Sequence, residues 1–308
     1  MFMNERILIT GANGFIGSNI TAELLANNTP ITAIVRNKSN TEVLKKIKCY
    51  NIISTDNYLD ATLIRKLSMS KPKFIIHCAW DKNSLINTRN MLNILEMAKQ
   101  IDCKNFITLG TFEEYGDNKK NINELDVCAP KSNFGKIKYA HYLLAKELCS
   151  SLNINHIHVR LGIPYSNKYN ANFFFTNVIK SLSKNEPVIL DGLLDSKDYI
   201  HTSDIARGLN ALIQNDLSGL YNLSFGQAIE IKSVLNMIYE KLNKKFYFNE
   251  EGMLDKITFN LSIKKIYSDT NWKPTISIWD GIALLIQETK FKNRPSLEEF
   301  AKRIRSLY

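Results

Sequence analysis

RILITGANGFIGSN, residues 6–19, sets the architecture of this chain. Its apolar run Ile7–Ile9 is typical of a parallel strand buried on both faces, and apolar residues at helical spacing follow from Ile20 onward. Glycine lets the backbone approach a pyrophosphate, and a helix N-terminus offers free N–H groups and a positive dipole end. The stretch therefore predicts a dinucleotide-binding turn between strand and helix rather than a purely structural one, with cofactor contacts from Gly11, Asn13, Gly14, Phe15, Ile16 and Gly17.

The composition narrows the class of protein. A chain of 308 residues can form one large domain or two smaller ones. It contains no apolar run of transmembrane length and no signal peptide pattern, so we expect a cytoplasmic protein that does not contact a membrane. Five cysteines without metal-ligand spacing favour reduced thiols and no metal site. The net charge of +10 comes from scattered lysines without an aromatic platform, which favours a solvated surface with a bias towards anionic ligands over nucleic-acid binding.

Further strands alternate with helices along the first half of the chain. Strands are expected at 31–35, 52–54, 74–80, 105–109 and 157–160, and a helix is expected at 84–100. Strands that alternate with helices need crossover connections, which are right-handed and make the sheet parallel. The order predicts a doubly wound α/β nucleotide-binding domain that binds its ligand at the carboxyl edge of the sheet.

The end of the second expected strand bears on the choice of cofactor. An NAD site carries a carboxylate here for the adenosine ribose, whereas this chain has Arg36, then Lys38, and no acid nearby in the sequence. A guanidinium can pair with a 2′-phosphate, so the pattern favours NADP(H) over NAD(H). The alternative is an exposed arginine without a role. Asp56 follows the third strand and is placed to meet the adenine amine.

Five short segments, spread over nearly the whole chain, can be compared with the motifs of known proteins: Thr10–Gly17, His77–Trp80, Arg160–Tyr165, Lys197–Ala206 and Trp272–Pro274. Together they resemble the extended short-chain dehydrogenase/reductase family, in its branch of nucleotide-sugar epimerases, dehydratases and ketoreductases. The resemblance implies a Rossmann-type parallel sheet over residues 1–162 and a smaller mixed C-terminal substrate lobe over 163–308, with the chain crossing back around 190–215. It also implies a nucleotide-diphosphate sugar as substrate, cofactor contacts from Ala79 and Trp80, and a homodimer.

The same resemblance implies the catalytic residues. Thr111 matches the residue whose hydroxyl bonds the reacting oxygen, and Lys138 matches the lysine that holds the nicotinamide ribose and lowers the pKa of a neighbouring phenol. Phe134, however, stands where the family has its proton-exchanging tyrosine. Loss of a general acid typically costs about 10² to 10⁴ in rate. Three interpretations stay open: a native tyrosine was replaced to trap substrate; another donor acts, such as Thr111, a water on Lys138, or Glu113; or the chain has lost catalysis.

The residue types around Thr111 narrow the reaction. Dehydratases of the family carry a glutamate at the position of Glu113, and this chain keeps it. They also carry an aspartate one residue earlier, where this chain has Phe112. In addition, Arg36 argues against a permanently held NAD. We therefore expect NADPH-dependent reduction of a 4-keto nucleotide sugar. The alternatives are a C4 epimerase, a 4,6-dehydratase and, in another class, a non-catalytic NADP(H)-binding sensor. Glu113 and Glu114 could also be solvated turn acids. Substrate contacts are expected from Asn172, Lys197 and His201.

Overall fold

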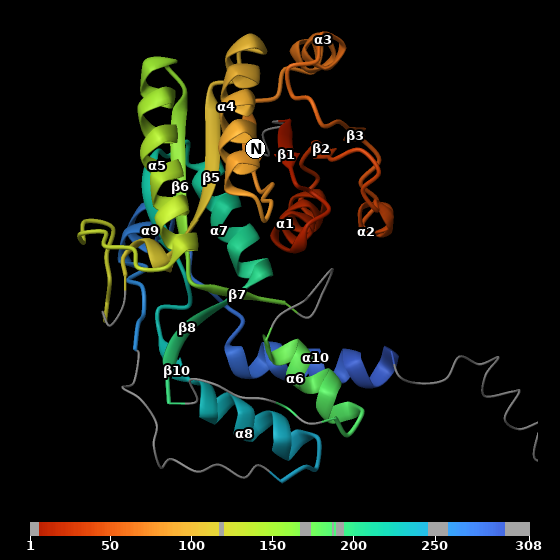
Figure 1. Ribbon diagram of the computed structural model, residues 1–308, viewed down its shortest axis with the longest axis vertical. Coiled ribbons are helices and arrows are strands. Elements are labelled where there is room, and N and C mark those ends of the chain that lie inside the picture. The colour runs from red at the N-terminus through yellow and green to blue at the C-terminus, as the bar shows by residue number, and fades with distance from the viewer. Residues whose placement is uncertain are drawn as a thin grey trace, which may run out of the picture.

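A seven-stranded parallel sheet forms the larger part of the molecule (Figure 1). The computed structural model describes residues 6–116, 120–166, 174–186, 188, 194–245 and 258–292. The strand order is β3-β2-β1-β4-β5-β6-β9, with bounds β1 Ile7–Thr10, β2 Ile31–Val35, β3 Ile52–Ser54, β4 Phe74–His77, β5 Asn105–Thr111, β6 Asn155–Leu161 and β9 Gly219–Leu223. The order reverses between β1 and β4, which is the point where open α/β sheets bind ligands.

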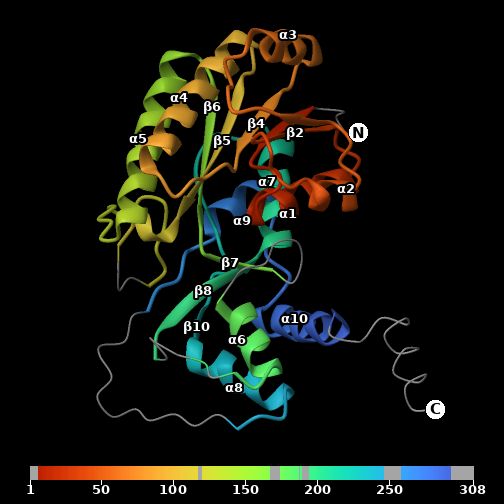
Figure 2. The same cartoon turned by 45° about the vertical axis from the view of Figure 1, so that its right-hand side comes forward.

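Helices cover both faces of this sheet (Figures 1 and 2). One face packs against α1 (Phe15–Ala26), α2 (Glu42–Lys46), α7 (Thr202–Gln214) and α9 (Lys264–Thr270), and the other against α3 (Ala61–Ser70), α4 (Ser84–Gln100) and α5 (Asn133–Ser151). In β1, Ile7 and Ile9 enter the first core and Leu8 enters the second. Because side chains alternate across a strand, a strand covered on both faces needs a continuous apolar run.

A smaller lobe lies below the large sheet in both views (Figures 1 and 2). Its sheet has the order β10-β8-β7, in which β7 runs parallel and β10 antiparallel to β8. The strands are β7 Ile163–Tyr165, β8 Ser196–His201 and β10 Ala228–Glu230, and the helices are α6 Phe174–Ser183, α8 Ile231–Lys241 and α10 Ile278–Lys292. These helices share an apolar core of their own. The structure confirms the expected fold class, a doubly wound parallel sheet with a smaller mixed lobe.

The chain returns from the small lobe to the large sheet after β8. There α7 packs against α1, and β9 pairs with β6. At the start of α7 the buried carboxylate of Asp204 accepts the N–H groups of Thr275 at 2.9 Å and Ile276 at 3.0 Å. In β8 the buried carboxylate of Asp198 accepts the N–H of Leu261 at 3.0 Å. Both acids satisfy backbone groups that irregular segments leave without a ladder partner.

Strand ends differ from the expected bounds at several points. The strand expected over 74–80 stops at His77, because β1 ends opposite it and offers no further ladder partner. The strands expected over 105–109 and 157–160 are both longer, since β5 and β6 stay paired as far as Thr111. Within the described ranges, no helix is both long and apolar enough to cross a membrane.

Candidate active site

The turn between β1 and α1 leaves no room for side chains at Gly11 and Gly17. Gly11 has a φ of +65°, and a Cβ there would stand 2.6 Å from the Cα of Ala79. A Cβ at Gly17 would collide with the carbonyl oxygen of Gly11. Helix α1 has no side-chain cap at Gly14 and no acidic residue in its first turn. Its free N–H groups and dipole therefore fit the pyrophosphate of a dinucleotide.

The other members of the expected cofactor loop lie on the rim of this turn. Asn13 donates from its side-chain amide to the carbonyl of Asn40 at 3.2 Å. Phe15 and Ile16 are partly buried in the first turn of α1, where Ile16 packs against the core under that face of the sheet. Their backbone N–H groups, rather than their side chains, are what this geometry offers to a phosphate.

Lys138 lies at the carboxyl ends of β4 and β5, on the face of α5 that carries Phe134 one turn earlier. Its Nζ donates to the carbonyl oxygen of Leu109 at 2.9 Å and stands 3.8 Å from the centre of the Trp80 ring. The Trp80 and Phe134 rings meet edge to face, with their centres 5.5 Å apart. Both rings are partly exposed, at 37% and 41%. The ammonium is therefore held by one carbonyl and covered by an aromatic face, an attractive arrangement for a cation.

Burial changes the acidity of Lys138. Loss of solvent lowers its pKa to about 8, although the charges of Glu114 and Cys78 act in the opposite direction. A lysine ionises less readily once it loses water, because the protein interior solvates an ammonium poorly. Lys138 therefore carries its proton at neutral pH but releases it far more readily than a surface lysine does.

Thr111 and Glu113 meet the N-terminus of α5. The hydroxyl of Thr111 accepts the N–H of Glu113 at 3.4 Å in the short 3₁₀ turn Phe112–Glu114. The carboxylate of Glu113 accepts a short hydrogen bond from the hydroxyl of Ser132, which also caps α5 by accepting the N–H of Gly135 at 2.9 Å. The fold thus brings Thr111, Glu113 and the first turn of α5 into one cluster.

Glu114 is a site residue that the sequence analysis missed. It is fully buried, and its carboxylate accepts the N–H of Thr111 at 3.0 Å and the Nε–H of Arg160 at 2.7 Å. The Nε2 of His158 lies 3.2 Å away. Burial opposes ionisation here, but His158 and Arg160 together hold the pKa of Glu114 below its usual value. Glu114 is therefore an ionised anchor for the backbone of Thr111.

One sequence feature could have indicated this cluster. Polar residues at 156, 158 and 160 alternate with the apolar residues Ile157, Val159 and Leu161 in β6, which is buried from Ile157 onward. Gly110 lies opposite Arg160 in the sheet, and a Cβ at Gly110 would collide with the side chains of Glu114 and His158. A buried charge needs partners, so a buried arginine predicts a buried acid nearby.

A family model described as the NAD dependent epimerase/dehydratase family matches residues 7–224. The chain belongs to the NAD dependent epimerase/dehydratase family. The dTDP-4-dehydro-6-deoxyglucose reductase of Escherichia coli is 26% identical over 93% of this chain and 98% of that protein. A putative UDP-glucose 4-epimerase of Methanocaldococcus jannaschii is 25% identical over 94% of this chain and 99% of that protein. The chain is thus an enzyme of a family that includes nucleotide-sugar reductases and epimerases.

A solved structure shows the same fold. The UDP-glucose 4-epimerase of Thermus thermophilus, in complex with NAD, superposes with a TM-score of 0.79 at 21% identity, over 94% of this chain and all of that chain (100%). The family name and this neighbour agree with a nicotinamide dinucleotide as the cofactor of the fold. The glycine turn of the present chain has the shape that such a cofactor needs.

The residues expected at the adenosine end of the cofactor, Arg36 and Asp56, lie in the loops after β2 and β3. Arg36 is 65% exposed, and its guanidinium pairs with Asp81 at 2.7 Å. The sequence shows no acid near Arg36, but the fold supplies one from the loop between β4 and α4. An exposed ion pair of this kind contributes little to stability, so a stronger anion can displace Asp81.

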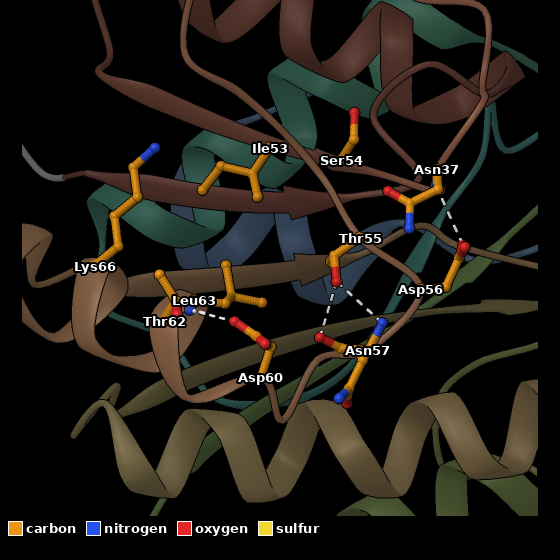
Figure 3. A pocket seen from close by; sticks show the side chains of 10 residues that line it. All are labelled: Asn37, Ile53, Ser54, Thr55, Asp56, Asn57, Asp60, Thr62, Leu63 and Lys66. Carbon is orange, nitrogen blue, oxygen red and sulfur yellow. Dashed lines mark hydrogen bonds between the residues drawn. The ribbon is translucent and has the colours of Figure 1, made fainter.

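A hollow of about 470 Å³ opens beside these loops (Figure 3). Asp56 lines it and accepts the N–H of Asn37 at 3.2 Å. Figure 3 shows the other lining side chains, from β3, the loop after it and α3: Ile53, Ser54, Thr55, Asn57, Asp60, Thr62, Leu63 and Lys66. Most of these side chains are polar, which suits a ligand group that carries several hydrogen-bonding atoms.

The residues expected to contact substrate have separate places in the fold. Lys197 in β8 pairs with Asp195 at 3.2 Å. His201 is buried at the end of β8, where its Nδ1 accepts the N–H of Ser203 at 3.2 Å and caps α7. Asn172 lies outside the described residues. Contacts of Lys197 and His201 with a substrate stay predictions.

Proposed function

We propose that this protein reduces a 4-keto nucleotide-diphosphate sugar with NADPH. The observation that carries the proposal is the hydrogen bond from Lys138 to the carbonyl of Leu109, two residues before Thr111 at the carboxyl end of β5, in a fold whose β1–α1 turn fits a dinucleotide. The Escherichia coli relative, a reductase by name, supports the direction of the reaction. A reductase of this kind needs one group that stabilises the negative charge developing on the carbonyl oxygen and one group that donates a proton to it.

Each residue of the site has a separate role in the proposed reaction. When bound, the cofactor supplies a hydride for the carbonyl carbon. Gly11, Gly14 and the N-terminus of α1 hold its pyrophosphate. Lys138 places a positive charge next to the carbonyl oxygen, where negative charge develops in the transition state, and the hydroxyl of Thr111 donates a hydrogen bond to the same oxygen. Glu114 keeps Thr111 in place through its backbone N–H.

Arg36 supports NADPH as the reductant. Its guanidinium can leave Asp81 and pair with the 2′-phosphate in a fork geometry. Asp56, in the hollow beside it, is proposed to accept a hydrogen bond from the adenine amine.

The test follows NADPH oxidation with a panel of 4-keto-6-deoxy nucleotide-diphosphate sugars. We expect turnover with at least one of them, and loss of turnover in Lys138→Ala. The Phe134→Tyr variant serves as a positive control, because a phenol at this position restores the family's proton donor. The proposal is contradicted if neither the unchanged chain nor Phe134→Tyr oxidises NADPH with any substrate of the panel.

A C4 epimerase is the second candidate. The ion pair between Arg36 and Asp81 favours it, since a guanidinium that stays with Asp81 places no demand on a 2′-phosphate and suits a retained NAD. Such an enzyme oxidises and reduces the same centre, so it copurifies with nicotinamide and needs no added reductant. Analysis of the cofactor released from the purified protein on denaturation distinguishes the two functions.

We also propose that the enzyme is a homodimer through α4 and α5. Leu85 and Leu92, two turns apart on α4, and Leu143 on α5 are exposed. Exposed apolar side chains gathered on adjacent helices indicate an interaction surface. Light scattering after gel filtration should give twice the mass of the chain, and Leu92→Glu should give a monomer. A monomer before any substitution contradicts this assembly.

A further inference from the structure

Phe134 raises the question of where the proton for the sugar alcohol comes from. Among the described residues of this site, exchangeable protons are carried by the side chains of Cys78, Thr111, Ser132, Lys138 and His141. Burial raises the pKa of the Cys78 thiol to about 12, so it is a poor proton donor. The hydroxyl of Ser132 is engaged on both sides, because it donates to the carboxylate of Glu113 and accepts the N–H of Gly135. His141 is engaged with the hydroxyl of Thr88 at 2.9 Å, and burial together with Lys138 lowers its pKa, so it is neutral at pH 7.

The hydroxyl of Thr111 can stabilise an oxyanion but is too weak an acid to supply a proton by itself. Lys138 is different, because an ammonium has three protons, and within the part of the chain that the structure describes one of them is hydrogen-bonded, to the carbonyl of Leu109. Phe134 lies one helical turn from Lys138, and the Nζ stands 5.7 Å from the centre of its ring. The ammonium is therefore next to the position from which a tyrosine would act.

We propose that the ammonium of Lys138 is itself the proton donor in this enzyme. The inference rests on the proposed ketoreductase function. Tyrosine-dependent relatives would use the lysine to tune a phenol, whereas this chain, with no phenol at 134, uses the lysine directly. Lys138 is then a catalytic residue that contacts the carbonyl oxygen.

The hydride and the proton reach the carbonyl group from different donors. The carbonyl carbon receives a hydride, with two electrons, from NADPH, which is oxidised to NADP⁺. The C–O double bond becomes a single bond, and the oxygen takes a proton from the Nζ of Lys138. The N–H bond breaks with its electron pair staying on nitrogen, so Lys138 becomes a neutral amine. It regains a proton from water after the product leaves.

The surroundings of Lys138 support this role. A donor works best when its pKa lies near the operating pH, and burial brings the pKa of Lys138 to about 8. The ring of Trp80 covers the ammonium at 3.8 Å. The titratable groups that interact with it come from the strands and helices around it: His77 and Cys78 at the end of β4, Glu114 after β5, His141 on α5 and His158 on β6.

A four-protein cycle tests the proposal: the unchanged chain, Phe134→Tyr, Lys138→Arg and the double variant. Arginine keeps the positive charge but does not release a proton at any working pH. We expect Lys138→Arg to lower kcat by about 10² or more in the unchanged chain, in the range expected for loss of a general acid. In the Phe134→Tyr background the phenol donates instead, so the same substitution should cost at least about tenfold less.

The outcomes separate the two proposals. Equal losses in both backgrounds overturn proton donation by Lys138, because the lysine then only positions other groups, while the ketoreductase function stands. Activity in Phe134→Tyr alone also overturns it. No NADPH oxidation in any of the four proteins overturns the ketoreductase function and the proton donor with it.

A measurement without cofactor or substrate gives an independent check. Lysine labelled with carbon-13 at Cε reports its own ionisation by NMR, and Lys138→Arg identifies the signal by its loss. We expect that signal to titrate near pH 8, as the buried ammonium requires. Titration in the range of ordinary lysines, above about 10, would overturn the proposal. In the active enzyme, kcat should fall as pH rises through the same value, because the acid form is the donor.

Discussion

The backbone N–H of Thr111 donates to the carboxylate of Glu114 at 3.0 Å, inside a cluster that excludes water. The same carboxylate holds Arg160. The geometry of Thr111, for which we propose a catalytic role, therefore depends on a buried charge on the side chain of Glu114. Low polarity around such a cluster strengthens each hydrogen bond but also makes an unpaired member costly.

Glu114→Gln should destabilise the protein by about 3–5 kcal/mol, since it leaves the charge of Arg160 buried without its partner. Urea unfolding at neutral pH measures the loss. Glu113→Gln is the matched control, because the neighbouring acid is only partly buried and accepts from the exposed Ser132; it should change stability by less than about 1 kcal/mol. Equal effects of the two substitutions would show that the buried cluster contributes nothing special.

The coenzyme preference should respond to both members of the Arg36–Asp81 pair. Arg36→Ala should weaken NADPH binding by about tenfold or more, as expected for loss of a charge-assisted bond to phosphate, and leave NADH nearly unchanged. Asp81→Asn should strengthen NADPH binding by a few-fold, because the 2′-phosphate no longer competes with a carboxylate. Fluorescence titration with the two coenzymes measures both. An unchanged preference in Arg36→Ala would remove the case for NADP(H).

Gly11→Ala should abolish dinucleotide binding, because the new methyl group meets the backbone of Ala79 and the φ of +65° disfavours any side chain. Gly219→Ala is the control: it shares a positive φ of +93°, but nothing lies within 4 Å of its added Cβ. That variant should lose about 1–2 kcal/mol of stability and bind the cofactor normally. Calorimetric titration with the cofactor measures binding by both variants. Normal binding by Gly11→Ala would contradict the assignment of the β1–α1 turn as the pyrophosphate site.

Asp198 should make the protein less stable as pH rises from about 4 to 7. Burial raises its pKa to about 7, against the hydrogen bonds from the N–H groups of Phe225, Gly226 and Leu261. Over that range the folded chain keeps a proton that the unfolded chain has lost, so stability falls by up to about 1.4 kcal/mol per pH unit. Asp198→Asn should flatten this slope in urea unfolding at a series of pH values. The same slope in both proteins would assign the pH dependence to other groups.

Much of the fold follows from local pattern. The apolar strands, the glycine turn and the helix at 84–100 are visible in sequence because each depends on near neighbours. The strand ends were less well predicted, since pairing partners set them, as β1 does for His77. The acid beside Arg36 was not predicted either, because Asp81 is 45 residues away in the chain and only the fold brings the two side chains together.

Residue order alone was enough to predict the parallel α/β architecture, which the structure confirms, because spacing and residue type carry that information. The dinucleotide turn, and Phe134 at the position where the resembled family has its tyrosine, were also read from residue order and stay predictions. The three-dimensional arrangement was needed to show that Glu114 is a buried anchor rather than a solvated turn acid, and that Trp80 covers Lys138. Those facts depend on which distant segments surround a side chain. Burial and charge partners set its acidity and its role, and neither can be read from its neighbours in the chain.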